Sequence, residues 1–359
     1  MSEVHSMKWF HGGDWAEYQR ETGFLPLDFS ANISPLGLPA GVKEAVLASL
    51  ESADRYPDPH CVELRCALSA QYGIPAEKIV CGNGAADLIY RLVLLLKPKN
   101  AIVPVPAFTE YERALSLTGC RINRILCKEE EDFLLPETVS DAISPETNLV
   151  FLCNPNNPTG RFVPAGLLER ILQRCEEAGC LLVVDECFLG FSEETEQHSL
   201  LRCLSQYPHL VLLRAFTKLY AMPGLRLGTA LCGNSDLAER LRAFGQPWSV
   251  SAPAQAAGLA ALQDKDYVNR IRSYVKEERA FLQKELSEIG MRVIPGEANF
   301  LLFFTEERQL SQKLREKGIL LRDCSDFTGL CPGWYRTAVR TREENLLLLQ
   351  AIKEVLHGS

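Results

Sequence analysis

Four short stretches of the chain carry side chains that could do chemistry together. CGNGAADLI (81–89) is a glycine-rich turn entering a helical pattern, and the free backbone N–H groups of such a helix start favour a phosphate. NPNNPTG (154–160) is a polar turn that could present an amide. VVDECF (183–188) ends an apolar run with a carboxylate, and FTKLYAMPGLRLG (216–228) adds a hydroxyl, an amine and a guanidinium.

These groups together suit one cofactor, pyridoxal 5'-phosphate (PLP). The amine of Lys218 can form a Schiff base with the cofactor aldehyde, and Asp185 can pair with the pyridine nitrogen and keep it protonated. Arg226 and the helix start can hold the phosphate. Burial and neighbouring cations should lower the pKa of the Lys218 amine and leave it nucleophilic. The residues therefore predict a PLP-dependent enzyme.

The elements that must position these residues alternate along the chain. Short apolar runs typical of buried strands cover 101–106, 148–153, 180–185, 209–215 and 228–232. Amphipathic helical patterns lie between most of them, at 86–96, 165–179 and 235–244 among others. This alternation predicts an α/β unit with a mainly parallel sheet. In such sheets the site lies at the carboxyl ends of the strands, which is where Asp185 and Lys218 fall.

The pattern changes after Gly245. A long helical pattern ends at Gly290, and it is followed by a strand-like segment at 298–304, a helix at 306–317 and a last helix at 342–356. We therefore expect a large PLP-binding domain at 36–245. Residues 246–359 should form a smaller α+β domain, with 1–35 as an N-terminal arm that packs against it.

Composition narrows the class of protein. The chain has 359 residues and a formal net charge of −8, which argues against a nucleic-acid partner. No apolar run reaches the roughly 18 residues that a membrane span needs, and we expect no membrane association. The 13 cysteines include no CxxC pair, so we expect reduced core residues in a cytoplasmic protein and no metal site.

The motifs NPNNPTG, D-x-x-[YF] and [ST]-K-x-x-x-x-x-G-x-R-x-G occur in that order. In this the chain resembles the fold-type-I PLP-dependent transferases of the aminotransferase class I/II superfamily, over nearly its whole length. The resemblance implies a mainly parallel seven-stranded sheet between helices and a homodimer with a shared active site. RYPDP (55–59) and GNGAAD are similar to two groups, the histidinol-phosphate aminotransferases and the threonine-phosphate decarboxylases. HGGD (11–14) and LDFSANISPLG (27–37) look more like the decarboxylases.

The resemblance also implies roles for single residues. Lys218 would form the Schiff base, Asp185 would pair with the pyridine nitrogen, and Asn157 would hydrogen-bond the ring oxygen. Phe108 would stack on the ring. The residues implied for the cofactor phosphate are Gly84, Ala85, Ala86, Thr217 and Arg226, with Tyr56 reaching it from a second subunit. Those implied for the acid groups of the substrate are Arg336 and, as further candidates, Arg322, Arg340, His11 and Asn32.

Two positions depart from the family pattern. Position 188 is Phe where the aminotransferases usually have Tyr, so a hydroxyl near the ring oxygen is missing. Position 215 is Ala where relatives often carry Ser or Thr, which removes one expected phosphate contact.

The function that we expect is decarboxylation of a phosphorylated hydroxy-amino acid in cobamide biosynthesis. Threonine phosphate would give aminopropanol phosphate and serine phosphate would give ethanolamine phosphate; both stay open, because one methyl group is worth only about 1–3 kcal/mol in a pocket. The alternative is histidinol-phosphate aminotransferase, whose substrate has a phosphate but no carboxylate. A second alternative, a PLP-binding protein without turnover, is opposed by the retention of Lys218 and Arg336.

Overall fold

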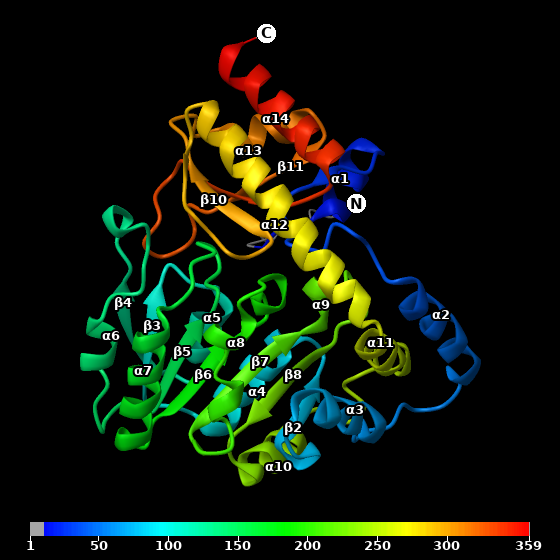
Figure 1. Cartoon of the computed structure of the whole chain (residues 1–359), viewed down its shortest axis with the longest axis vertical. Helices are drawn as coiled ribbons and strands as arrows, with labels where there is room; N and C mark the ends of the chain where they lie inside the picture. Colours follow the sequence, from blue (N-terminus) through cyan, green and yellow to red (C-terminus); the bar gives the residue numbers. More distant parts are fainter. Residues whose placement is uncertain (1–10, 359) are drawn as a thin grey trace, which may run out of the picture.

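A seven-stranded sheet fills the lower part of the molecule in Figure 1, and a four-stranded sheet lies above it. This computed structural model describes residues 11–358. The strands of the large sheet lie in the order β2 (Ile79–Gly82), β8 (Gly228–Cys232), β7 (Leu210–Ala215), β6 (Leu181–Asp185), β5 (Leu149–Cys153), β3 (Asn100–Val105) and β4 (Arg121–Leu126). Only β8 runs antiparallel to its neighbours in this sheet. The predicted mainly parallel seven-stranded sheet is confirmed.

Helices cover both faces of the large sheet. Within β6, Leu182 and Val184 point into one core cluster, while Leu181 and Val183 point into the other. The first cluster is closed by α3 (Val62–Tyr72), α7 (Ala165–Ala178) and α11 (Ala252–Gln263), and the second by α4 (Ala85–Leu96), α5 (Glu110–Ser116) and α10 (Ser235–Phe244). Burial on both faces explains why these strands read as continuous apolar runs.

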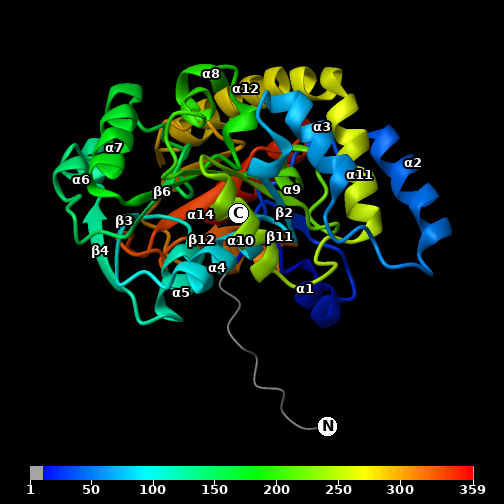
Figure 2. The same ribbon diagram turned by 90° about the horizontal axis from the view of Figure 1, so that it is seen from below.

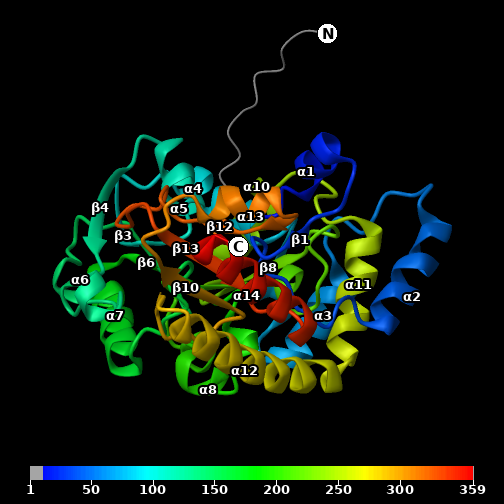
Figure 3. The same cartoon turned by 90° about the horizontal axis from the view of Figure 1, so that it is seen from above.

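The small sheet is antiparallel. Its strands lie in the order β12 (Arg322–Asp323), β13 (Trp334–Ala338), β10 (Phe300–Phe304) and β9 (Arg292–Val293). An apolar cluster joins it to α12 (Lys265–Glu288), α13 (Leu310–Glu316) and α14 (Arg342–His357). Figure 3, seen from above, shows α14 lying across this part of the molecule.

The N-terminal arm is tied to the far end of the chain. It carries α1 (Trp15–Thr22) and β1 (Leu27–Asp28), and β1 pairs in parallel with β11 (Ile319–Leu320). The backbone N–H of Ala338 in turn donates to the carbonyl of Phe29 at 2.9 Å. The arm is therefore held by the same residues that build the small sheet.

The division at residues 36–245 and 246–359 stays a prediction. α11 lies outside the first range, yet it packs against α2 (Ala40–Ser49) and α3, and Figures 2 and 3 both show α2 beside α11. α12 then runs from this layer up to the small sheet (Figure 1).

The other elements are short: α6 (Thr138–Asp141), α8 (Thr195–His198), α9 (Phe216–Leu219), η1 (Leu50–Ser52), η2 (Ala76–Lys78), η3 (Glu129–Glu131), η4 (Leu189–Phe191) and η5 (Leu201–Cys203).

All 13 cysteines carry free thiols, and eight of them are buried in the core clusters, at 61, 81, 127, 153, 175, 180, 232 and 324. Across residues 11–358, no helix has the length and apolar character that crossing a membrane would require.

Candidate active site

The carboxyl ends of three neighbouring strands bring the predicted groups together. Asp185 is the last residue of β6 and lies opposite Cys153, the last residue of β5. The turn that carries Asn157 follows β5, and α9, which carries Thr217 and Lys218, follows β7 directly. This is the edge at which parallel α/β sheets place their sites.

Asp185 is held as a buried carboxylate. Its side chain is 5% exposed. Its Oδ2 accepts from the hydroxyl of Tyr111 at 2.7 Å, and its Oδ1 accepts from the backbone N–H of Cys187 at 3.0 Å. Burial raises the pKa of Asp185, and the hydrogen bonds from Cys187 and Tyr111 act in the opposite direction. Tyr111 itself is fixed by a stacked contact with Phe151, with ring centroids 4.8 Å apart.

Lys218 has the electrostatic surroundings of a reactive amine. Burial, and after it the positive charges of Arg336 and Arg226, lower its pKa to about 8. The backbone carbonyl of Lys218 accepts from the N–H of Ser34 at 3.0 Å, which connects α9 to the N-terminal arm.

A phosphate cradle lies where α4 begins. Gly84 precedes the helix with φ 82° and ψ 165°, a conformation essentially confined to glycine. A Cβ at this position would come within 2.5 Å of Nη2 of Arg226. The first turn of α4, with Ala85 and Ala86, therefore presents its unpaired N–H groups beside the guanidinium of Arg226. Thr217, which directly precedes Lys218, is buried on α9.

Arg336 joins the small sheet to the large one. It lies on β13 and donates to Oδ1 of Asn157 and, at 3.1 Å, to the carbonyl of Ser30. Its Nε is buried and has no hydrogen-bond partner among the described residues. Burial, together with the charge of Arg322, lowers the pKa of Arg336 to about 10. A buried guanidinium of this kind is suited to an anionic ligand.

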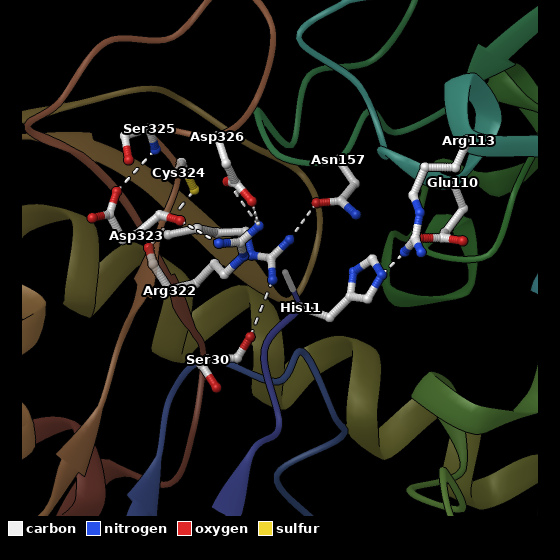
Figure 4. A network of polar contacts seen from close by, with 11 residues as sticks. His11, Ser30, Glu110, Arg113, Asn157, Arg322, Asp323, Cys324, Ser325 and Asp326 are labelled. Carbon is white, nitrogen blue, oxygen red and sulfur yellow. Dashed lines mark hydrogen bonds and ion pairs between the residues drawn. The ribbon is translucent and has the colours of Figure 1, made fainter. Parts of the chain in front are cut away.

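Arg322 lies opposite Arg336 on the neighbouring strand. The two residues are register partners between β12 and β13, so their side chains lie on one face of the small sheet. Arg322 pairs with the carboxylate of Asp326, at 2.8 and 2.9 Å, and packs over the ring of Phe327 (Figure 4). The guanidinium groups of Arg322 and Arg336 therefore lie on the same face of the small sheet, and that of Arg322 is paired with Asp326.

His11 and Asn32 bring the N-terminal arm to the site. His11 Nε2 lies 2.7 Å from Oε1 of Glu110, and the ring lies 5.9 Å from that of Phe108, between Asn157 and Glu110 in the view of Figure 4. Asn32 is 2% exposed, and its Oδ1 has no hydrogen-bond partner within residues 11–358. An unpaired buried amide oxygen of this kind is costly without a ligand.

Arg340 and Tyr56 lie apart from this cluster. Arg340 donates to Glu344 at 2.7 and 3.0 Å in the turn that begins α14, so its side chain supports the start of that helix. Tyr56 is 78% exposed and stacks on Trp248, with centroids 4.2 Å apart. Phe188, the other departure from the family pattern, is buried and packs edge-on against Phe300, with ring centroids 5.0 Å apart.

Comparisons with known proteins agree with this geometry. The model of the family "Aminotransferase class I and II" matches residues 26–352. The chain belongs to this family. It is 38% identical to threonine-phosphate decarboxylase of Salmonella typhimurium, over 97% of each chain. It is 32% identical to histidinol-phosphate aminotransferase 2 of Carboxydothermus hydrogenoformans, over 95% of this chain and 94% of the other.

A solved member of the same fold is histidinol-phosphate aminotransferase from Sinorhizobium meliloti in complex with PLP. Its TM-score is 0.86 at 21% identity, over 100% of this chain and 98% of the other. The family and this fold make the chain a PLP-dependent enzyme. The residues present fit the cofactor: the glycine cradle lies beside Arg226, a buried carboxylate ends β6, and an amine with a pKa near 8 follows β7.

Several side chains of the site were not singled out from the sequence. Tyr111, Glu110 and Ser30 hold Asp185, His11 and Arg336 respectively. Glu110 and Tyr111 lie two and three residues after Phe108, but only the packing of α5 against the sheet shows which partner each one has. The sequence offered no signal for Ser30, because it contributes a backbone carbonyl.

Proposed function

We propose that the chain is a PLP-dependent decarboxylase of a phosphorylated hydroxy-amino acid in cobamide biosynthesis. Its substrate is L-threonine O-phosphate or L-serine O-phosphate, which gives aminopropanol phosphate or ethanolamine phosphate with release of CO2. The observation that carries the proposal is the pair of facing arginines, Arg336 and Arg322, on one face of the small sheet. Such substrates carry two anionic groups, and two guanidinium groups can bind them separately. The identity of 38% to a threonine-phosphate decarboxylase supports the same function.

The side chains of the site would bind the cofactor, orient it and move a proton. When bound, PLP supplies an electron sink for the charge that develops at Cα as a bond to it breaks. Asp185, which accepts hydrogen bonds from Tyr111 and the Cys187 N–H, would pair with the protonated pyridine nitrogen. The lowered pKa of Lys218 lets its amine act as nucleophile and move a proton near neutral pH. We propose that Asn157 bonds the ring oxygen and that Phe108 stacks on the ring.

Selection of the bond that breaks rests on the orientation of the substrate. Arg336 is fixed by Asn157 and the Ser30 carbonyl, so an acid group bound to it has a defined direction. We propose that Arg336 takes one acid group and that Arg322, with His11 and Asn32, takes part in binding the other. The arginines would in this way decide which bond to Cα breaks, and a carboxylate held in the productive orientation would be lost as CO2.

A transaminase function is the second candidate, favoured by the 32% identity to a histidinol-phosphate aminotransferase. Histidinol phosphate has no carboxylate, but an aminotransferase must also bind 2-oxoglutarate, which has two. The higher identity of 38% to a threonine-phosphate decarboxylase is therefore what makes decarboxylation the stronger proposal.

We also propose that the protein is a cytoplasmic homodimer with a shared active site. Tyr56 and Trp248 form an exposed aromatic pair at the edge of the large sheet layer. Exposed apolar side chains at Leu47, Leu50 and Val62 surround the same part of the chain. A second copy would cover this surface and let Tyr56 reach the cofactor phosphate of its neighbour.

A product assay tests the function. Purified protein with PLP is offered O-phosphothreonine, O-phosphoserine and histidinol phosphate separately, each with 2-oxoglutarate, and the products are identified by mass spectrometry. We expect an amino-alcohol phosphate and CO2 without glutamate. Whichever of O-phosphothreonine and O-phosphoserine reacts faster identifies the product that cobamide biosynthesis uses. Formation of glutamate from 2-oxoglutarate, with histidinol phosphate as the amino donor, would refute the proposal and identify the chain as an aminotransferase.

A further inference from the structure

A second cavity lies behind the catalytic strand ends. It has a volume of about 750 Å³, and its walls come from the end of α3, the segment from η4 to η5, α9 and the first turns of α12. Figures 2 and 3 both show α8 beside α12 on this side of the molecule. Lys218 and Arg336 are not among the lining residues, so this space is separate from the cofactor site. A volume of this size suits a small organic ligand.

One wall of the cavity is charged but already balanced. Glu186 is buried and accepts from Arg214 at 2.6 Å, from the hydroxyl of Ser199 at 3.0 Å and from the N–H of Leu200 at 3.1 Å. Arg214 also lies over the ring of Tyr72, 4.8 Å from its centroid. These contacts satisfy the pair, and they leave no net charge on this wall.

Arg272 on α12 supplies a positive charge that is not balanced. Its Nε donates to the carbonyl of Gly190 at 3.0 Å, and this bond orients the guanidinium towards the cavity. No carboxylate of residues 11–358 lies within 4.0 Å of it. The nearby carboxylate of Glu193 is occupied by Lys276 at 2.6 Å. Burial lowers the pKa of Arg272, and the charge of Arg214 acts in the same direction, whereas Tyr220 and Glu193 act in the opposite direction.

Lys78, Glu196 and Arg202 also line the cavity, with Arg202 paired to Glu169 at 2.5 Å, and a further part of the wall is apolar and aromatic. It includes Phe216, Leu219, Tyr220, Leu262 and Val268. A polar anion alone would leave these side chains against water, whereas a ligand with an aromatic or aliphatic body would cover them.

We propose that this cavity is a second binding site, which takes an organic anion with an apolar body and holds its acid group on Arg272. The cavity shares its wall with the active site, because Cys187 and Ala215, which line it, are close in sequence to Asp185 and Lys218. A ligand bound here therefore rests on the segments that position the catalytic carboxylate and amine.

The test uses the PLP-loaded protein and 8-anilinonaphthalene-1-sulfonate, an organic anion with an aromatic body, whose fluorescence reports binding. The variants are Arg272→Gln and Arg272→Lys, with Arg270→Gln as the matched control, because Arg270 is exposed on the same helix and does not line the cavity. We expect Arg272→Gln to weaken binding at least tenfold, Arg272→Lys to weaken it less, and Arg270→Gln to leave it unchanged.

Leu262→Trp provides an independent test, because it fills the cavity and leaves every charge in place. It should lower the number of bound probe molecules per chain while the absorption band of the cofactor is retained. Equal probe binding by the unaltered protein, Arg272→Gln and Leu262→Trp would overturn the proposal. If Arg272→Gln fails to fold, as judged by its melting curve, the Leu262→Trp result alone decides.

Discussion

Replacing Tyr111 by Phe removes one hydroxyl and leaves the ring in its stack on Phe151. The lost group is the one that donates to Oδ2 of Asp185 at 2.7 Å, in a place where Asp185 is 5% exposed. Water cannot easily take over the bond at that depth, and Cys187, through its backbone N–H and its thiol, would remain as a donor to the carboxylate. The pKa of Asp185, already raised by burial, should rise further.

The expected loss of PLP affinity in Tyr111→Phe follows from the free energy of a hydrogen bond to a charged group, about 1.5–3 kcal/mol. The ionised form of Asp185 loses that stabilisation, and with it the ion pair to the cofactor. At about 1.4 kcal/mol for each factor of ten, PLP should bind roughly 10- to 150-fold more weakly. Turnover should fall as well, because a less protonated pyridine nitrogen is a poorer electron sink.

The assay is a titration of the cofactor-free protein with PLP, followed by absorbance, together with kcat at saturating PLP. Tyr90→Phe is the control, since it removes a hydroxyl that donates to Glu110 at 2.5 Å and does not contact Asp185. We expect the control to bind PLP as the unaltered protein does. Equal PLP affinity and equal kcat in Tyr111→Phe and Tyr90→Phe would refute the reasoning, because the Tyr111 hydrogen bond would then not sustain the charge of Asp185.

Three further predictions concern single features of the site. The Lys218 amine has a pKa of about 8 and reacts only when neutral. The rate at which the cofactor-free protein binds PLP should therefore rise about tenfold per pH unit below pH 8 and level off above it. Stopped-flow absorbance measures this rate, and a rate that does not change with pH would contradict the prediction. Gly84→Ala should lower stability by about 1–3 kcal/mol and weaken PLP binding, because φ 82° disfavours alanine and the methyl group would meet Arg226; thermal melts and the PLP titration measure both. Arg340→Ala should leave kcat/KM within about twofold and cost about 0.3–0.5 kcal/mol of stability in a denaturant melt, because the side chain pairs with Glu344; a large rise in KM would instead make Arg340 a substrate ligand.

The strands at the centre of the sheet could be predicted because their burial on both faces produces uninterrupted apolar runs. β6 and β7 were found in this way, with boundaries within one residue or so of the structure. β4 was not found, because it is an edge strand: Arg121, Asn123 and Arg124 are exposed on it, and its sequence lacks an apolar run. The antiparallel direction of β8 also leaves no mark on residue type.

The residues of the candidate site could also be predicted only in part from the sequence. Lys218, Asp185 and Arg226 could be named because their order and spacing are tied to a local motif at one strand end or helix start. The partners of these residues could not, because they depend on how distant elements pack. Glu110 is 99 residues from His11, and Arg336 is 179 residues from Asn157, and only the folded chain brings each pair together. The two acid-binding candidates Arg322 and Arg340 look alike in sequence, yet one faces Arg336 and the other supports the start of α14.

The pairing of β1 with β11 bears on the order in which the enzyme is completed during synthesis. Residues 27 and 28 can find their partners only after residues 319 and 320 have left the ribosome, when nearly the whole chain has been made. The large sheet closes much earlier, since its last strand ends at Cys232. The cofactor-binding sheet can therefore form while the arm that carries His11 and Asn32 is still unattached. Substrate recognition is assembled last, and a nascent or truncated chain could fold around PLP before it could select what it acts on.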